Sequence, residues 1–172
     1  MDRDWHAARQ RAERRVRPLL ALVPRPWNVD TFLDRLETKR DEPIDVVAVE
    51  YQPGAPSGAW QLREGRHLIA YPTNTSPLHQ DHIILHEIGH MLFEHRGDCT
   101  LALDEAQRIA PNLAPAAFAH LLTRVTTELD EYEAEMVAVS IITYATTSTP
   151  ILYAADQRAS RVAQRFASML GS

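Results

Sequence analysis

Three residues in the stretch Asp81–His90 (DHIILHEIGH) have the types and the spacing of a hydrolytic zinc site. His86 and His90 are four residues apart, so on a helix they share one face and both imidazoles can converge on one ion. Glu87 lies about 100° around the helix from His86, close enough to reach a water on that ion without ligating it. This H-E-x-x-H pattern predicts Zn2+ held by the two histidines, with Glu87 as the catalytic general base.

The residues around this motif favour a buried site. Apolar side chains wrap most of the same helix, namely Ile83, Ile84, Leu85, Ile88, Met91, Leu92 and Phe93. Histidines and a glutamate without partners would each cost several kcal/mol in such surroundings, and a bound metal removes that cost. Gly89 lies inside the helix, where alanine would be better by about 1 kcal/mol. Two explanations stay open for this glycine: another group approaches the backbone closely, or the helix simply packs tightly.

A hydrolytic zinc site needs a further protein ligand and an open position for water. An acidic segment later in the chain (ELDEYEAE) supplies candidates at the point where a helix begins. Glu128, Glu131 and Glu135 share one helical face, whereas Asp130 and Glu133 point elsewhere. Acids at a helix start also compensate the helix dipole, but that accounts for one or two of them and not for a buried pair. The residues by themselves leave open which of the three glutamates closes the site.

The apolar pattern predicts helices and a small sheet in the first half of the chain. A helix over Trp5–Val23 is expected to break at Pro18, and a second helix is expected to begin at the Asn28 cap and to end before Pro43. The β-branched run Ile44–Tyr51 predicts a central strand. The segments Ala59–Leu62 and His67–Tyr71, joined by a turn at Glu64-Gly65, predict a hairpin.

Helices are expected for the rest of the chain. They are Leu78–His95, ended by Gly97 as a cap; Ala114–Arg124; a helix from a capping box at Thr127 to about Thr143; and an amphipathic helix after Pro150. The predicted class is therefore α+β, with a sheet of about three strands packed on the H-E-x-x-H helix and further α-helices. We expect a single domain, with N-terminal helices in 1–42, the sheet in 43–75, metal-binding helices in 77–147 and a C-terminal helix in 150–172.

Composition and charge exclude several classes of function. A net charge of -5 over 172 residues argues against direct nucleic-acid binding, and we interpret the arginine-rich run Arg9–Arg17 as a solvated face. No stretch approaches the roughly 20 apolar residues of a membrane span, and the first residues lack the apolar core of a signal peptide. The single cysteine, Cys99, excludes an internal disulfide, and we assign it no role. These features predict a cytoplasmic protein.

DHIILHEIGH, followed about forty residues later by EYEAE at 131–135, resembles the ImmA/IrrE family of zinc metallopeptidases. The similarity covers roughly residues 44–144 and implies a zincin-like fold. His86 and His90 match the histidine ligands of that family, Glu87 matches its general base, and Glu131 matches its glutamate ligand. Glu135 matches the second-shell carboxylate behind a ligating histidine, although the family usually has Asn or Asp there. The continuation Met136-Val137-Ala138 also departs from the family's small-Phe-Ala, which implies a different substrate groove.

The resemblance implies a zinc metalloendopeptidase that hydrolyses a peptide bond in a protein, in many cases a helix-turn-helix transcriptional regulator. An extended substrate would pair with a strand of the hairpin in 59–71. Two other interpretations stay open: a non-catalytic zinc-binding regulator that sequesters a DNA-binding partner, and a helical scaffold whose histidines are core residues.

Peptide hydrolysis also needs an oxyanion donor, for which the candidates are His79, His82, His95 and Tyr132.

Overall fold

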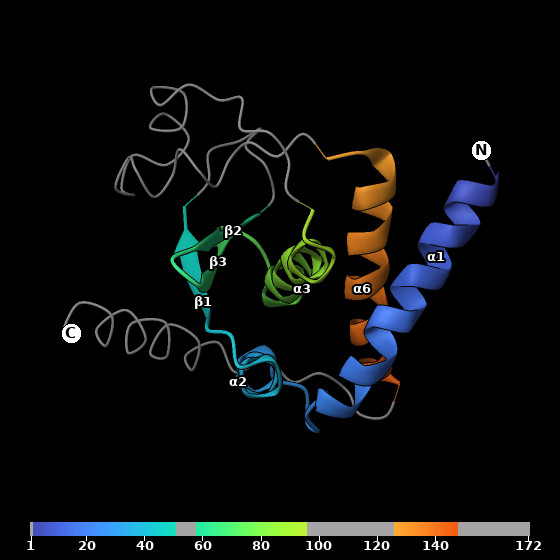
Figure 1. The fold of residues 1–172 in the computed structure, drawn as a ribbon. Coiled ribbons are helices and arrows are strands. Elements are labelled where there is room, and N and C mark those ends of the chain that lie inside the picture. The colour runs from blue at the N-terminus through green and yellow to red at the C-terminus, as the bar shows by residue number, and fades with distance from the viewer. Residues whose placement is uncertain (1, 51–57, 96–125, 148–172) are drawn as a thin grey trace.

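Four α-helices, one 3-10 helix and three strands make up the residues that the computed structural model describes, which are 2–50, 58–95 and 126–147 (Figure 1). In chain order they are α1 (Asp2–Val16), η1 (Arg17–Leu22), α2 (Val29–Arg40), β1 (Ile44–Val49), β2 (Ala59–Arg63), β3 (Arg66–Pro72), α3 (Pro77–Phe93) and α6 (Glu128–Thr146). The α+β class predicted from the sequence is confirmed. Cys99, Gly97, the predicted helix over Ala114–Arg124 and the predicted helix after Pro150 lie outside the described residues.

The break at Pro18 and the bounds of the second helix agree with the sequence prediction, whereas α1 begins at Asp2, before the predicted Trp5. The chain leaves α1 at Val16 and continues as η1, which has Pro18 in its first turn, because proline cannot supply the N–H that an α-helix interior needs. Asn28 caps α2, since its side chain accepts a hydrogen bond of 2.8 Å from the backbone N–H of Thr31. In the described ranges no helix is both long enough and apolar enough to cross a membrane.

The three strands form a mixed sheet in the order β1-β3-β2. β2 and β3 are antiparallel and joined by a tight turn in which Glu64 and Gly65 both have positive φ, which confirms the predicted hairpin. β1 pairs with β3 in parallel. The predicted central position of β1 is therefore wrong: in the described sheet β3 is central and β1 lies at an edge. The apolar run of β1 reflects burial of its two faces, which does not require a hydrogen-bonded neighbour on both sides.

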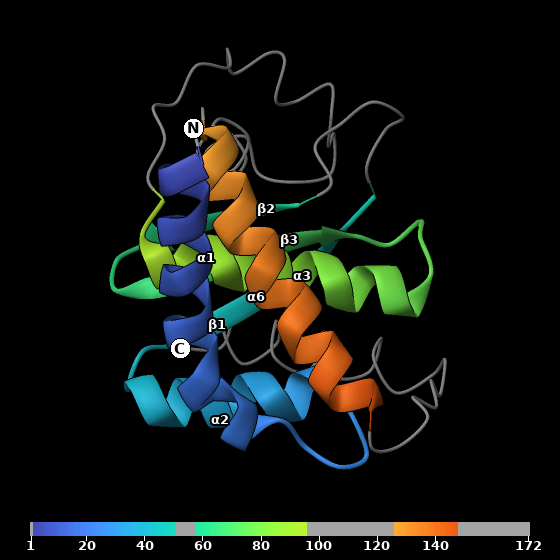
Figure 2. The same ribbon diagram turned by 90° about the vertical axis from the view of Figure 1, so that its right-hand side faces the viewer.

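Helix α3 lies between the sheet and α6, and α1 packs on α6 further out (Figures 1 and 2). This position explains why α3 is apolar on most of its surface, because the sheet covers one side and α6 crosses the other. The largest fully buried side chains come from α2, the sheet, α3 and α6, and include Phe32, Leu36, Ile44, Ile69, Ile84, Leu85, Ile88 and Ile141. The H-E-x-x-H motif is thus carried by the central element of the core.

Helix α3 ends earlier than predicted. Its last residue is Phe93, and the left-handed capping position is taken by Glu94 (φ 54°) and not by Gly97. The N–H of His95 then returns to the carbonyl of His90 with a hydrogen bond of 3.0 Å, as in a Schellman ending. The side chain of His95 is thereby turned back toward His90.

Helix α6 begins with the predicted capping box. The hydroxyl of Thr127 accepts from the N–H of Asp130 at 3.2 Å, and the Asp130 carboxylate accepts from the N–H of Thr127 at 2.9 Å. The helix crosses α3 at Gly89, where an added Cβ would lie only 2.6 Å from Cα and 2.8 Å from the carbonyl oxygen of Ala134. The two explanations left open for Gly89, a close approach to its backbone and tight helix packing, are therefore the same contact: the backbone of α6 crosses α3 at this glycine. It brings the acidic first turns of α6 against the histidines of α3.

Candidate metal centre

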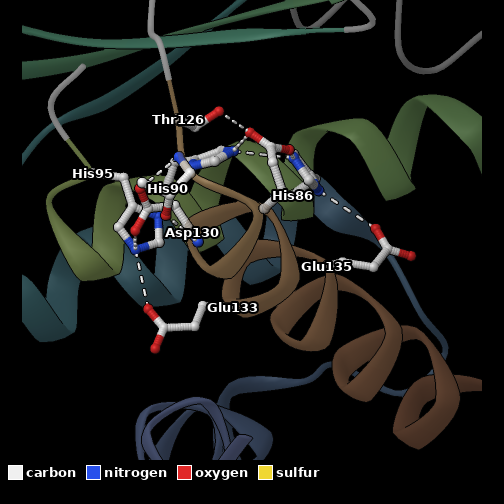
Figure 3. A network of polar contacts seen from close by, with 9 residues as sticks. His86, His90, His95, Thr126, Asp130, Glu133 and Glu135 are labelled. Atoms are coloured by element: carbon white, nitrogen blue, oxygen red, sulfur yellow. Dashed lines mark hydrogen bonds and ion pairs between the residues drawn. The ribbon is translucent and has the colours of Figure 1, made fainter. Parts of the chain in front are cut away.

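The Nε2 atoms of His86 and His90 point toward each other. These atoms lie 3.1 Å apart, and the two rings are nearly perpendicular at 73°. Figure 3 shows both rings on one side of α3, next to the start of α6. His90 is only 3% exposed, and His86 is partly buried. The helical spacing therefore produces the convergence that the sequence predicts.

Glu131 is the acid that reaches both imidazoles. Its Oε2 lies 3.2 Å from His86 Nε2, and its Oε1 lies 3.5 Å from His90 Nε2. The hydroxyl of Thr126 donates a hydrogen bond to the same carboxylate. Of the three glutamates that the sequence left open, the structure groups Glu131 with the two histidines, while Glu128 is exposed.

The spacing of these ligand atoms suits a tetrahedral zinc ion. Zinc bonds to nitrogen and carboxylate oxygen are about 2.0–2.1 Å long, so neighbouring ligands of a tetrahedron lie about 3.3 Å apart. The two Nε2 atoms lie 3.1 Å apart, Glu131 Oε2 lies 3.2 Å from His86 Nε2, and Glu131 Oε1 lies 3.5 Å from His90 Nε2, so each pair of residues is close to this spacing. Two imidazole nitrogens and one carboxylate also form a donor set that zinc accepts readily. The residues present therefore fit the ion that the family resemblance implies.

The electrostatics of the cluster favour a cation. Burial disfavours a charged imidazole, but the hydrogen bond to Glu131 and the charges of three nearby carboxylates outweigh it and raise the pKa of His86 above its ordinary value. Hydrogen bonds from His86 and His90 hold the pKa of Glu131 well below its usual range. Glu131 is thus an ionised ligand near neutral pH, and zinc would compete with a proton at His86.

Glu135 lies behind His86, on the side away from the other ligand atoms. Its Oε2 is 3.4 Å from His86 Nδ1 and 3.0 Å from His82 Nε2 (Figure 3). The longer glutamate side chain thus reaches the ring nitrogen at which the family places Asn or Asp. A carboxylate there orients a ligating imidazole and keeps the hydrogen on Nδ1.

Glu87 is 4% exposed, and its charge is one of those that raise the pKa of His86. It lies beside Gly58, the residue before β2: a Cβ built on Gly58 would be 3.0 Å from Glu87 Oε1 and 2.5 Å from Ile83 Cγ2. Only glycine lets the chain pass this close. A glycine directly before a predicted strand is the signal in the sequence for such a close backbone approach.

If zinc binds here and Glu87 is the general base, as the sequence predicts, Gly58→Ala should impair catalysis without removing the metal. The new methyl would push the side chains of Ile83 and Glu87 aside, whereas it lies against none of the three candidate ligands. A displacement of about 1 Å at a catalytic group can cost about 100-fold in rate. Metal content and peptide-cleavage rate, measured on the same preparation, check this. Unchanged cleavage would mean that Glu87 is not held by this contact.

The four candidates for an oxyanion donor are placed as follows. His82 contacts Glu135, and His79 is exposed and stacks on His82. Tyr132 packs edge-on against Trp5 of α1, at a centroid distance of 5.1 Å. His95 lies against the Nδ1 of His90, opposite the Nε2 that faces His86. His82, His95 and Tyr132 are each engaged with a neighbouring side chain.

A second polar cluster lies directly beside the first, and sequence reasoning missed it. His95 Nε2 is 3.1 Å from Glu133 and 3.4 Å from Asp130. Arg11 of α1 forms an ion pair of 2.5 Å with the other oxygen of Glu133. Arg11 is 46% exposed, as the interpretation of Arg9–Arg17 as a solvated face predicts, but α1 packs on α6 and brings its guanidinium to a buried carboxylate, which that interpretation did not include. Asp130 and Glu133 do point away from His86, as predicted, and toward His95.

Comparisons with protein-family models, with curated proteins and with solved structures found no match for this chain. The function of this chain is therefore inferred from the geometry of the site and from the residues of the two motifs.

Proposed function

We propose that this protein is a cytoplasmic, zincin-like zinc metallopeptidase that hydrolyses a peptide bond in a helix-turn-helix transcriptional regulator. The observation that carries the proposal is the convergence of His86, His90 and Glu131 beside a buried glutamate, Glu87, that belongs to the same motif. Three ligands with a fourth position left for water, and a carboxylate close by, are the components of a hydrolytic zinc site.

In this proposal His86, His90 and Glu131 hold the ion, and Glu135 orients His86. Bound zinc would supply Lewis acidity, which polarises a peptide carbonyl and makes a neighbouring water acidic enough to lose a proton near neutral pH. The carboxylate of Glu87 accepts that proton and returns it to the nitrogen of the leaving amine. The apolar residues around α3 exclude bulk water from the carboxylate.

The edge position of β2 supports a protein as substrate. In the described sheet β2 pairs only with β3, so its other edge can accept an extended chain by strand addition. The strand begins next to Gly58, whose backbone passes beside Glu87. A peptide paired with β2 would therefore run past the proposed general base. The identity of the substrate as a transcriptional regulator comes from the family resemblance.

A non-catalytic zinc-binding regulator that sequesters a DNA-binding partner is the alternative. It is favoured by the orientation of the candidate oxyanion donors, because His82, His95 and Tyr132 are engaged with Glu135, His90 and Trp5. Both functions need the zinc ion, and they differ only in the role of Glu87.

Replacing Glu131 with Gln tests the ligand set that both functions share. We expect the wild-type chain to bind one zinc ion and the Glu131→Gln variant to lose more than the roughly 10–100-fold in affinity that an outer partner typically contributes. Glu128→Gln is the matched control, because it removes the same charge from the same helix at an exposed position. Metal analysis and chelator competition give the affinities. A wild-type chain that is folded and binds no zinc would disprove the proposal and leave the histidines as core residues.

A further inference from the structure

We propose that His95, Glu133 and Arg11 form a hydrogen-bonded relay that holds His90 in the tautomer needed to ligate zinc through Nε2. The inference rests on the proposed zinc site and assigns positioning roles to three residues outside the ligand set. None of the three touches the reacting atoms, so they act through His90 alone.

Each residue of the relay lies within hydrogen-bond distance of the next. His90 Nδ1 lies 3.1 Å from His95 Nδ1, and His95 Nε2 lies 3.1 Å from Glu133 Oε2. The other oxygen of Glu133 accepts from Arg11 Nε at 2.6 Å. In Figure 3 the ring of His95 stands between His90 and Glu133, on the opposite side of His90 from His86. The path thus leads from the zinc-facing imidazole to a guanidinium on α1.

Arg11, at the end of the relay, sets the direction of every hydrogen bond in it. Arg11 can only donate, so Glu133 is held as an ionised acceptor. The carboxylate then requires a donor at His95, which in the neutral imidazole places the ring hydrogen on Nε2 and leaves Nδ1 with a lone pair. This lone pair can accept only if His90 carries its hydrogen on Nδ1. His90 Nε2 is thereby left with the lone pair that a metal ligand needs.

Burial makes this arrangement costly to disturb. His90 and Glu133 are each 3% exposed, and the His95 ring is nearly as buried and stacks on Phe93 at 9° between planes. A donor facing a donor, or an unpaired carboxylate, would carry the full cost of its lost hydration here. The left-handed Glu94 that ends α3 is what turns His95 into this position.

The same residues could instead be read as a second metal site. His95, Asp130 and Glu133 do offer three ligand atoms close together. However, the guanidinium of Arg11 already supplies positive charge to Glu133, and the Asp130 carboxylate accepts from the backbone N–H of Thr127 in the capping box. A divalent ion would be forced next to a fixed cation. The geometry therefore favours the relay, and metal stoichiometry decides between the two.

Two pairs of variants test the relay in the full-length chain. Glu133→Gln keeps the size of the side chain, but its one amide oxygen can replace only one of the two carboxylate oxygens. The amide N–H then faces either Arg11 or His95, which breaks the hydrogen-bonded relay or reverses its direction. Glu128→Gln is its exposed control. His95→Phe keeps the stacking on Phe93 without an acceptor. His95→Asn places an amide oxygen where His95 Nδ1 lies and should rescue the contact to His90.

Zinc affinity is measured by chelator competition, and histidine tautomers are measured by nitrogen-15 NMR with and without zinc. We expect Glu133→Gln and His95→Phe to weaken zinc binding about 10–100-fold, with Glu128→Gln unchanged and His95→Asn close to wild type. In the wild-type chain His95 should carry its hydrogen on Nε2, with one zinc ion bound per chain.

Three results would overturn the relay: wild-type affinity in both Glu133→Gln and His95→Phe, a hydrogen on Nδ1 of His95 in the wild-type chain, or two ions per chain. A failure of the proposed function gives a different result, because the wild-type chain then binds no zinc at all. In that case the metal-free NMR spectra still decide whether His95 has the tautomer that the relay requires.

Discussion

We expect Glu87→Gln to slow the proposed peptide cleavage about 100- to 10,000-fold and to leave zinc bound. The amide has the size of the carboxylate but cannot accept a proton from water. Glu87 is not among the residues that offer a ligand atom to the candidate site, so the metal content should not change. The measurement is the initial rate of cleavage of purified helix-turn-helix regulators encoded by neighbouring genes, followed by mass spectrometry of the products.

Glu128→Gln serves as the control for loss of a negative charge, and it should cleave like the wild-type chain. The decisive contrary outcome is a Glu87→Gln variant that binds zinc normally and still exerts the full regulatory effect on its partner. That outcome would leave the fold and the metal in place and would favour the sequestering function over the peptidase.

Replacing Gly89 with Ala should separate α3 from α6. The added methyl would lie 2.6 Å from Cα and 2.8 Å from the carbonyl oxygen of Ala134, and backbone atoms cannot rotate away as a side chain can. Overpacking of this kind costs about 1–3 kcal/mol, which exceeds the roughly 1 kcal/mol that alanine contributes as a better helix former. The free energy of unfolding of the metal-free chain, measured in urea, should therefore fall.

Zinc affinity should fall in the same Gly89→Ala variant, because Glu131 lies one turn from Ala134 and moves with α6. The double variant Gly89→Ala with Ala134→Gly is an internal control: the obstructing atoms are backbone, so removing the Ala134 methyl should not restore stability. A Gly89→Ala chain that is more stable than wild type by about 1 kcal/mol would mean that the helices have room at this crossing.

Features that depend on neighbouring residues could be predicted from the sequence. The four-residue spacing of His86 and His90, the Asn28 and Thr127 caps, the break at Pro18 and the hairpin turn at Glu64-Gly65 all involve residues a few positions apart. Helical periodicity and turn chemistry act over this range, so the pattern of residue types is sufficient for them. The helix that carries the motif and the acidic helix that faces it were found in this way.

Only the tertiary structure decided which distant residues meet. The acidic helix offered three glutamates on one face, and the crossing at Gly89 selects Glu131, 45 residues from His86. The parallel pairing of β1 at the sheet edge and the approach of Gly58 to Glu87 depend on packing in the same way. The contact between Arg11 and Glu133 spans 122 residues and needs α1 to lie on α6. The sequence by itself determined the pair of histidines and their helix and, through the family resemblance, named Glu131. The placement of this candidate ligand beside the histidines and the support behind His90 come from helix crossings, which no local spacing encodes.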